Sequence, residues 1–107
     1  MTERVVIVGG IRTPIGRFGG TLKNVSSGFL AAHVITALLN KTGIHPEQVE
    51  EVILGEVRQT TESSNVAKVA AIRANIPVEV PAFTINRLCA SGMQAIASGV
   101  QQIQSEQ

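Results

Sequence analysis

Short continuous runs of apolar residues occur three times along the chain and predict three β-strands. Residues 5–8 form the first run, which ends in two glycines and is typical of a strand buried on both faces. Residues 51–57 and residues 80–85 form the other two, and the last run is rich in residues that favour strands. After each run, the spacing of the apolar residues changes.

Apolar residues recur at intervals of three or four after each run, which is the spacing of a helix face and predicts three α-helices. The first begins at Ser26 or Ser27, either of which can cap it, and ends near Gly43. The second is capped by Asn65 and ends at Asn75, and the third follows the last strand and runs to the end of the chain. In chain order, the apolar positions of these helices are Leu30, Val34, Ile35 and Leu38, then Val66, Val69, Ala70 and Ile72, then Met93, Ile96, Val100 and Ile103.

The alternation of strand and helix predicts a three-layer α/β fold with a mainly parallel sheet, because parallel strands need helical crossovers. A short helical turn is expected at residues 45–47, where Pro46 occupies a tolerated position and His45 has a local capping role. Residues 9–20 are rich in glycine but lack the motifs of phosphate and dinucleotide loops, so we expect a long shaped loop. Residues 60–64 are expected to form a polar loop.

Basic residues and a histidine lie on the predicted helices. Lys68 and Arg73, on the second helix, are interpreted as a solvated face in preference to a phosphate clamp. His33, on the first helix, is interpreted as a surface or interface histidine in preference to a catalytic one.

The composition fits one domain and does not indicate a nucleic acid or a membrane as a partner. The 107 residues are 44% hydrophobic and only 3% aromatic, so the core must rest on Val, Ile, Leu and Ala. A net charge of +1 supplies no basic field for nucleic acid, and no apolar segment is long enough to span a membrane. The N-terminus has no secretory pattern, and a single cysteine excludes an intramolecular disulfide, so we expect a cytoplasmic protein.

Cys89 is the only cysteine, and it lies where the third predicted strand turns into the third helix. The N–H groups at a helix N-terminus have no intrahelical acceptor, and with the helix dipole they favour the thiolate, which is the nucleophilic form. The same N–H groups can hold the oxyanion that forms when a thioester carbonyl is attacked. One interpretation is therefore an acyl-transfer site, and the other is a small buried hydrophobe that begins a helix.

Residues 86–96 read Asn-Arg-Leu-Cys-Ala-Ser-Gly-Met-Gln-Ala-Ile, which resembles the nucleophile segment of the thiolases. The pattern of that family is Asn-x-x-Cys-[Gly/Ala/Ser]-Ser-Gly followed by an apolar helix. Further segments match the family in chain order, namely residues 3–8, 11–20, 53–57 and 75–85. Asn75 stands where the family often has glycine, and asparagine is the next best residue for a left-handed backbone. The chain is thus identified as a member of the thiolase family over its whole length.

The resemblance implies an acyltransferase with a three-layer thiolase-like fold and an acyl-cysteine intermediate. Cys89 would take an acyl group from acyl-CoA, and acetyl-CoA would then attack it in a Claisen condensation, whose reverse is thiolysis of a 3-ketoacyl-CoA. Coenzyme A thioesters are substrates in this scheme, with no cofactor and no metal. The nucleophile turn is expected to be supported by Asn86, through a hydrogen bond at the strand end, and by Ala90, Ser91 and Gly92. Ser91 and Gly92 would allow a tight turn and a close approach to the acyl group.

The family's length implies that residues 1–107 are an incomplete N-terminal thiolase domain, containing most of the first βαβαβαββ half without the loop domain and C-terminal half. The later histidine and second cysteine of the family would lie outside this chain, so we expect these residues alone to be inactive. The intact protein is expected to be an acetyl-CoA acetyltransferase of fatty acid metabolism. It would form a homodimer through the strand that begins at Ala82 and ends at Asn86, with a tetramer as a larger assembly. Met93 is expected to pack into the core.

Two other interpretations stay open at this point. A non-catalytic thiolase-like lipid-binding or scaffold protein would keep the fold and lose the chemistry. A relative of the ketoacyl synthases or hydroxymethylglutaryl-CoA synthases would keep both a similar fold and a cysteine. The sequence Arg-Thr-Pro-Ile-Gly at residues 12–16 favours a thiolase over these relatives.

Overall fold

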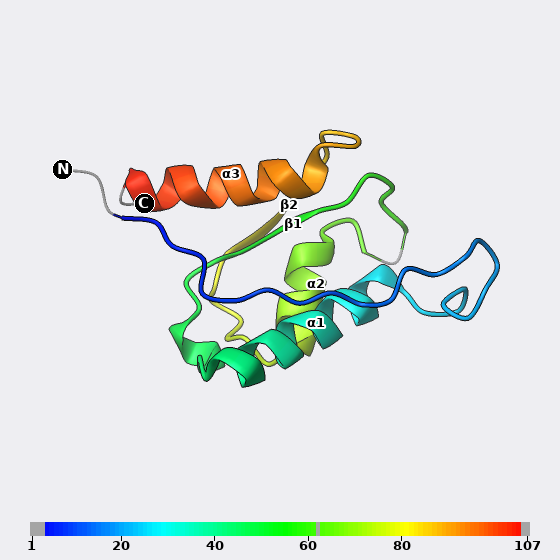
Figure 1. The fold of residues 1–107 in the computed structure, drawn as a ribbon, viewed down its shortest axis with the longest axis horizontal. Coiled ribbons are helices and arrows are strands. Elements are labelled where there is room, and N and C mark those ends of the chain that lie inside the picture. The colour runs from blue at the N-terminus through cyan, green and yellow to red at the C-terminus, as the bar shows by residue number, and fades with distance from the viewer. Residues whose placement is uncertain (1–3, 62, 106–107) are drawn as a thin grey trace.

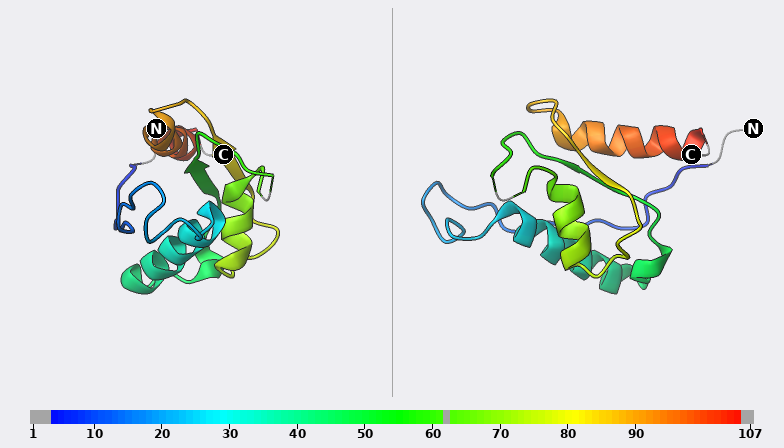
Figure 2. Two further views of the ribbon diagram at one scale, coloured as in Figure 1. Left: turned by 90° about the vertical axis from the view of Figure 1, so that its right-hand side faces the viewer. Right: turned by 180° about the vertical axis from the view of Figure 1, so that it is seen from behind.

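The computed structural model of the chain describes residues 4–61 and 63–105. In chain order the elements are α1 (Ser27–Thr42), the 3-10 turn η1 (Pro46–Gln48), β1 (Val52–Gly55), α2 (Val66–Arg73), β2 (Ala82–Ile85) and α3 (Ser91–Gln104). Figure 1 shows α3 on one face of the sheet and α2 with α1 on the other, and the turned views in Figure 2 keep this order. The three-layer α/β arrangement expected from the sequence is confirmed.

Helix α1 begins and ends at the residues that the sequence indicates. The Oγ of Ser26 accepts a hydrogen bond from the N–H of Phe29 at 3.1 Å, which caps the first turn. Gly43 ends the helix with a left-handed backbone (φ 74°), and its N–H donates to the carbonyl of Leu39 at 2.9 Å. The turn η1 follows, and the N–H of His45 donates to Oε1 of Gln48 at 2.8 Å. His45 therefore takes part in capping this turn, as expected, through its backbone N–H group.

Strands β1 and β2 pair in parallel, with Val52 opposite Ala82 and Gly55 opposite Ile85. Helix α2 makes the crossover between them, as the sequence order requires. Side chains alternate between the faces of β1, so Val52 and Leu54 face the α2 side while Ile53 lies against α3.

The core lies between the sheet and α2. Its buried residues are Val52, Ala67, Ala71, Ile76 and Val80, and the half-buried residues packed against them are Ile35, Leu39, Val49, Leu54 and Ala82. The alanines of α2 bring its backbone close to both the sheet and α1. A core made of Ala, Val, Ile and Leu is the one that the low aromatic content requires.

The predicted first strand, residues 5–8, does not form. The described part of the sheet has two strands, and residues 5–8 are in neither of them. The chain instead runs along α1, where Nζ of Lys41 donates to the carbonyl of Gly10 at 3.2 Å and Gly9 approaches Thr42. Ile7 is 84% exposed. An apolar run becomes a buried strand only where it pairs with a sheet edge between two covering layers, and residues 5–8 pair with neither β1 nor β2.

Helix α3 faces the sheet with small residues, which corrects the apolar face predicted for it. Ser91 and Ala95 are buried and Gly99 is half-buried, at intervals of four residues. Met93 is 78% exposed and Ile96 is also exposed, so the expectation that Met93 packs into the core is wrong for the described chain. The reason is that the start of α3 lies so close to β1 that only small side chains fit between them.

Helix α2 ends near Asn75, as expected. Its last helical residue is Arg73, and Asn75, two residues later, adopts a left-handed backbone (φ 64°). Two of its polar residues differ from the prediction. Asn65 occupies the N-cap position, but its side chain binds β2 and makes no cap hydrogen bond. Lys68 is half-buried, and its Nζ donates to the carbonyls of Val78 and Val80 at 2.6 and 2.7 Å. The ammonium group thus fixes the loop before β2 and does not belong to a solvated face.

Some sequence expectations fall outside the described residues. They concern residue 62 in the predicted polar loop and residues 106–107 at the end of the predicted third helix. The rest of residues 60–64 forms no helix or strand. None of the helices in the described ranges is long and apolar enough to cross a membrane.

Candidate active site

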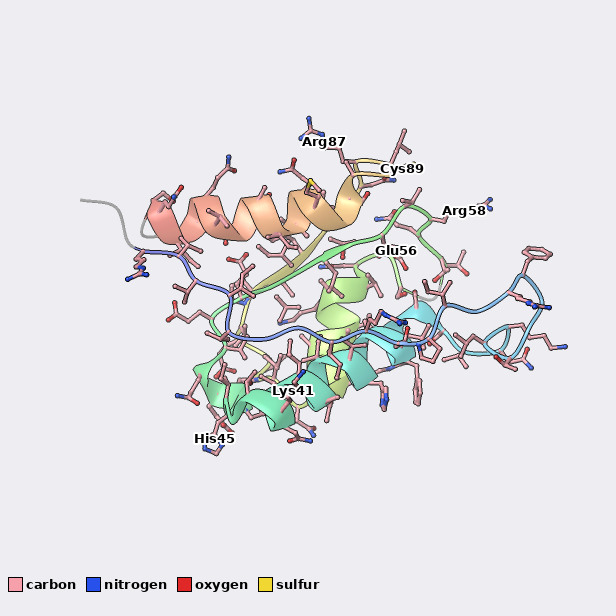
Figure 3. All side chains as sticks on the ribbon, in the orientation of Figure 1. Lys41, His45, Glu56, Arg58, Arg87 and Cys89 are labelled. Carbon is pink, nitrogen blue, oxygen red and sulfur yellow. The ribbon has the colours of Figure 1, made fainter. Side chains whose placement is uncertain are left out.

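Cys89 lies in the turn between β2 and α3, at the place that the sequence predicts. Figure 3 shows it with Arg87 at the start of α3, on the far side of the sheet from His45. The thiol is free and its residue is exposed. The interpretation of Cys89 as a small buried hydrophobe is therefore wrong for this structure.

Two overlapping backbone turns enclose Cys89. The N–H of Ala90 donates to the carbonyl of Arg87 at 3.1 Å, and the N–H of Ser91 donates to the carbonyl of Leu88 at 3.0 Å. Leu88 adopts a left-handed backbone (φ 50°), which is uncommon for a residue with a branched side chain. A conformation of this kind costs free energy and persists only where the surroundings fix it.

Asn86 fixes the turn on the strand side. Its Nδ2 donates to the carbonyl of Val57 at 2.9 Å, and its Oδ1 accepts from the N–H of Leu88 at 3.0 Å. The first bond ties the turn to the segment after β1, and the second supports the left-handed residue. The hydrogen bond expected of Asn86 at the strand end is present.

Ser91 fixes the turn on the helix side. It is only 4% exposed, and its Oγ accepts from the N–H of Arg87 at 2.8 Å while donating to the carbonyl of Leu88 at 2.6 Å. One hydroxyl thus holds both residues that precede Cys89. Arg87 is further held through its side chain, whose Nη1 donates to Oε1 of Gln94.

Ala90 and Gly92 contribute less to the turn than Asn86 and Ser91. Ala90 stands at the N-cap position of α3 and offers no side-chain cap. Gly92 is in the first turn of the helix, without a positive φ, and a Cβ at this position would meet no heavy atom within 4 Å. The turn itself therefore does not need a glycine at position 92.

Gly55 was not identified as a site residue from the sequence. It is the last residue of β1 and lies directly against the backbone of Ser91 and Gly92. A glycine in a strand often marks a place where another backbone approaches closely, so Gly55 at the end of its apolar run was the available signal in the sequence.

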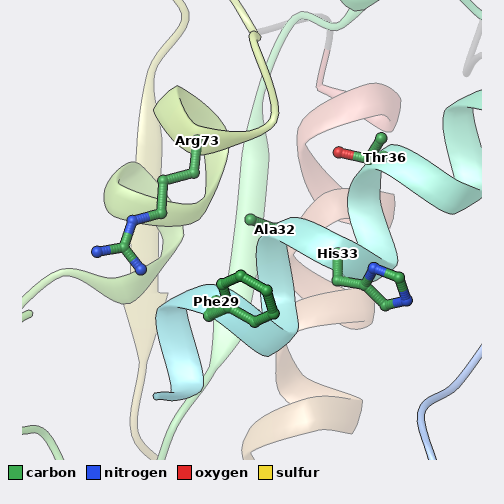
Figure 4. Close-up of a pocket in the computed structure, with 5 residues that line it drawn as sticks. All are labelled: Phe29, Ala32, His33, Thr36 and Arg73. Carbon is green, nitrogen blue, oxygen red and sulfur yellow. The ribbon is translucent and has the colours of Figure 1, made fainter. Parts of the chain in front are cut away.

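The remaining candidate groups lie away from Cys89. His33 is exposed on α1, as expected for a surface histidine. It lines a hollow of about 350 Å³ with Phe29, Ala32, Thr36 and Arg73. Figure 4 shows these five side chains, which come from α1 and α2. Among the described residues, no three His, Cys, Asp or Glu side chains gather into a candidate metal site.

Residues 5–107 match the family described as "Thiolase, N-terminal domain". The chain belongs to this thiolase family. The resemblance first indicated by residues 86–96 is confirmed, and the thiolase interpretation is supported over the ketoacyl synthase alternative.

Similar proteins carry related names. Over 105 residues, this thiolase domain is 49% identical to the acetyl-CoA acetyltransferase of Syntrophomonas wolfei, covering 98% of this chain and 26% of the relative. It is 42% identical over 100 residues to a probable acetyl-CoA acyltransferase of Staphylococcus aureus, covering 94% and 25%. The crystal structure of the Bacillus anthracis acetyl-CoA acetyltransferase matches with a TM-score of 0.92 at 47% identity, covering 96% of this chain and 26% of that one. The chain thus spans about a quarter of the length of these relatives.

Proposed function

We propose that the intact protein carrying this thiolase domain joins two acetyl-CoA molecules into acetoacetyl-CoA, or cleaves a 3-ketoacyl-CoA in the reverse direction. The observation that carries the proposal is the exposed thiol of Cys89, held in a fixed turn directly before the N-terminus of α3. The names of the relatives that are 49% and 47% identical support acetyl-CoA as the substrate class.

In the first proposed step, the Cys89 thiolate attacks the carbonyl carbon of an acyl-CoA. A sulfur–carbon bond forms, the thioester bond to coenzyme A breaks, and the coenzyme A thiolate that leaves takes up a proton. The N–H groups of Gly92 and Met93 lie in the first turn of α3, where a helix offers no acceptor. They are the proposed donors to the oxyanion that develops on the attacked carbonyl.

In the second proposed step, a base removes a proton from the methyl group of acetyl-CoA. The carbanion attacks the acyl group on Cys89, a carbon–carbon bond forms, and the cysteine leaves as the thiolate. Helix α1, which carries His33, lies on the other side of the sheet from α3, and Figure 3 places His45 on that side as well. We therefore propose that the base comes from sequence outside residues 1–107, and that these residues alone have no turnover.

The proposed assembly is a homodimer through residues 82–86. The carbonyl of Pro81 accepts a hydrogen bond from the N–H of Val52 in β1, and the carbonyl of Ile85 accepts one from Glu56, directly after β1. Alternate residues of β2 therefore direct their backbone groups toward its other edge. One of these groups, the carbonyl of Ala82, is already bound by Nδ2 of Asn65 at 3.0 Å. A partner strand would therefore pair with the part of β2 beyond Ala82. Sedimentation of the intact protein tests this proposal, and a strictly monomeric profile contradicts it.

Intact mass spectrometry after brief exposure to acetyl-CoA tests the chemistry. We expect one added acetyl group, mapped by peptide analysis to Cys89 and absent from the Cys89→Ala variant. Adding coenzyme A should remove the acetyl group and regenerate acetyl-CoA.

The control is alkylation of the same samples with iodoacetamide, which reports whether the thiol is accessible. A folded intact protein that is alkylated at Cys89 but never acetylated would contradict the proposal. Such a result would favour the non-catalytic scaffold or lipid-binding alternative.

A further inference from the structure

Gly55 and the first turn of α3 are in unusually close contact. A Cβ atom at Gly55 would lie 2.5 Å from the carbonyl carbon of Ser91, 2.6 Å from its oxygen and 2.7 Å from the nitrogen of Gly92. All three atoms belong to the backbone, so no side-chain rotation can relieve the contact. Any residue other than glycine at position 55 must push the start of α3 away from β1.

Space, and not backbone conformation, requires this glycine. Positive φ angles occur at Gly19 and Gly43 among the described glycines, and Gly55 has none. Gly55 is part of β1, where every L-amino acid can adopt the backbone angles. A Gly55→Ala substitution therefore acts through the contact with α3 alone.

A displacement of Ser91 reaches Cys89 through two bonds of the turn. The Oγ of Ser91 holds the N–H of Arg87 and the carbonyl of Leu88 at 2.8 and 2.6 Å. Leu88 is in the left-handed conformation and directly precedes Cys89. Moving the peptide of Ser91 must therefore either break these bonds or move the thiol with them.

We propose that Gly55 is a positioning residue of the Cys89 site. Its missing side chain sets how closely the first turn of α3 lies on β1, and so it sets where the thiol and the first-turn N–H groups point. For acyl transfer this inference rests on the proposed function, whereas the placement of the thiol can be tested without it.

Gly99 supplies a matched control from the same pair of elements. It also lies on the face of α3 that meets β1, but a Cβ there would have only Cδ1 of Ile53 nearby, at 3.9 Å. That is an ordinary van der Waals distance. Gly99→Ala therefore adds the same methyl group to the β1–α3 interface without moving the turn.

The experiment compares Gly55→Ala and Gly99→Ala in the intact protein at a temperature where circular dichroism reports both as folded. The first readout is the rate of iodoacetamide alkylation of Cys89 across pH, and the second is kcat and KM for acetoacetyl-CoA thiolysis. We expect Gly55→Ala to change the alkylation rate severalfold and to lower kcat by about tenfold or more, since small misplacements of reacting groups are costly. The loss should fall on kcat more than on KM, and Gly99→Ala should stay within about twofold of wild type.

Alkylation and turnover of Gly55→Ala that match those of Gly99→Ala would overturn the inference. If Gly55→Ala does not fold, the double variant Gly55→Ala/Gly99→Ala is measured, because alanine stabilises the helix at position 99. A double variant that also fails to fold would mean that Gly55 serves folding and not positioning. If wild-type Cys89 is never acetylated, the proposed function fails, while the alkylation rate still decides the role of Gly55.

Discussion

The hydroxyl of Thr84 donates to Oδ1 of Asn65 at 2.7 Å, and this bond joins β2 to the start of α2. The same oxygen of Thr84 accepts from the N–H of Ala67 at 3.1 Å. Asn65 completes the connection by donating from Nδ2 to the carbonyl of Ala82 at 3.0 Å. Because β2 continues directly into the turn that holds Cys89, these three bonds also fix the strand that leads into this turn.

Replacing Thr84 with valine should destabilise the protein without changing its shape. The substitution keeps the volume but leaves Oδ1 of Asn65 and the N–H of Ala67 without this partner, at a cost of about 1–3 kcal/mol. Chemical denaturation of the intact protein measures the change. Thr84→Ser keeps the hydroxyl and should recover most of the loss, and equal stability of the two variants would show that the hydroxyl has no such role.

Replacing Ser91 with alanine should both destabilise the protein and change the reactivity of Cys89. The N–H of Arg87 loses its acceptor in a half-buried hydrogen bond, which we expect to lower the free energy of unfolding by about 0.5–1.5 kcal/mol. Leu88 also loses a bond that holds its left-handed backbone, so the alkylation rate of Cys89 should change. Ser105→Ala is the control, because Ser105 is exposed at the end of α3 and its hydroxyl donates to the carbonyl of Gln102 within the same turn. Similar results for both variants would contradict the assigned role.

Replacing Lys68 with methionine should loosen the loop that precedes β2. The ammonium group binds two carbonyls, and its loss should lower the free energy of unfolding by about 1–3 kcal/mol. Lys41→Met is the matched control, since Lys41 is exposed and makes one longer bond to Gly10, at 3.2 Å. We expect that control to change stability by less than about 0.5 kcal/mol. Thermal denaturation compares the two, and a larger effect at Lys41 would refute the prediction.

Replacing Asn75 with glycine should stabilise the protein. Asn75 ends α2 with φ at 64°, a conformation that glycine adopts without a steric penalty. We expect a gain of roughly 0.5 kcal/mol for Asn75→Gly and a loss of about 1 kcal/mol for Asn75→Ala, which lacks a side-chain hydrogen-bonding group. Urea denaturation of both variants measures the difference. If alanine were as stable as glycine here, the left-handed backbone would not be limiting.

Local chemistry explains why much of the fold could be predicted. Ser26 and Gly43 bound α1 because a side-chain oxygen satisfies the first turn and a left-handed glycine ends the last one. The turn at Asn75 and the position of Cys89 between β2 and α3 follow from equally short stretches of sequence. In each case the atoms that decide the structure lie within a few residues of one another.

The errors occurred where distant segments decide the outcome. Residues 5–8 are apolar enough for a buried strand, yet they pair with neither strand of the described sheet, and the chain directly after them lies against α1 at Gly9 and Gly10. Met93 matches a helical apolar spacing, but the contact at Gly55 turns the small residues of α3 toward the sheet. The sequence pattern predicts Lys68 on a solvated face, but its ammonium group binds the carbonyls of Val78 and Val80 in the loop before β2.

The sequence by itself determined the order of the helices, the parallel character of the sheet, the thiolase resemblance and the identity of the nucleophile candidate. These depend on periodicity, caps and a short motif, all of which are local in the chain. Only the tertiary structure decided that Cys89 is exposed, that Ser91 holds Arg87 and Leu88, and that Gly55 lies against the first turn of α3. Gly55 and Ser91 are far apart in sequence, and no local preference of either residue encodes the distance between them.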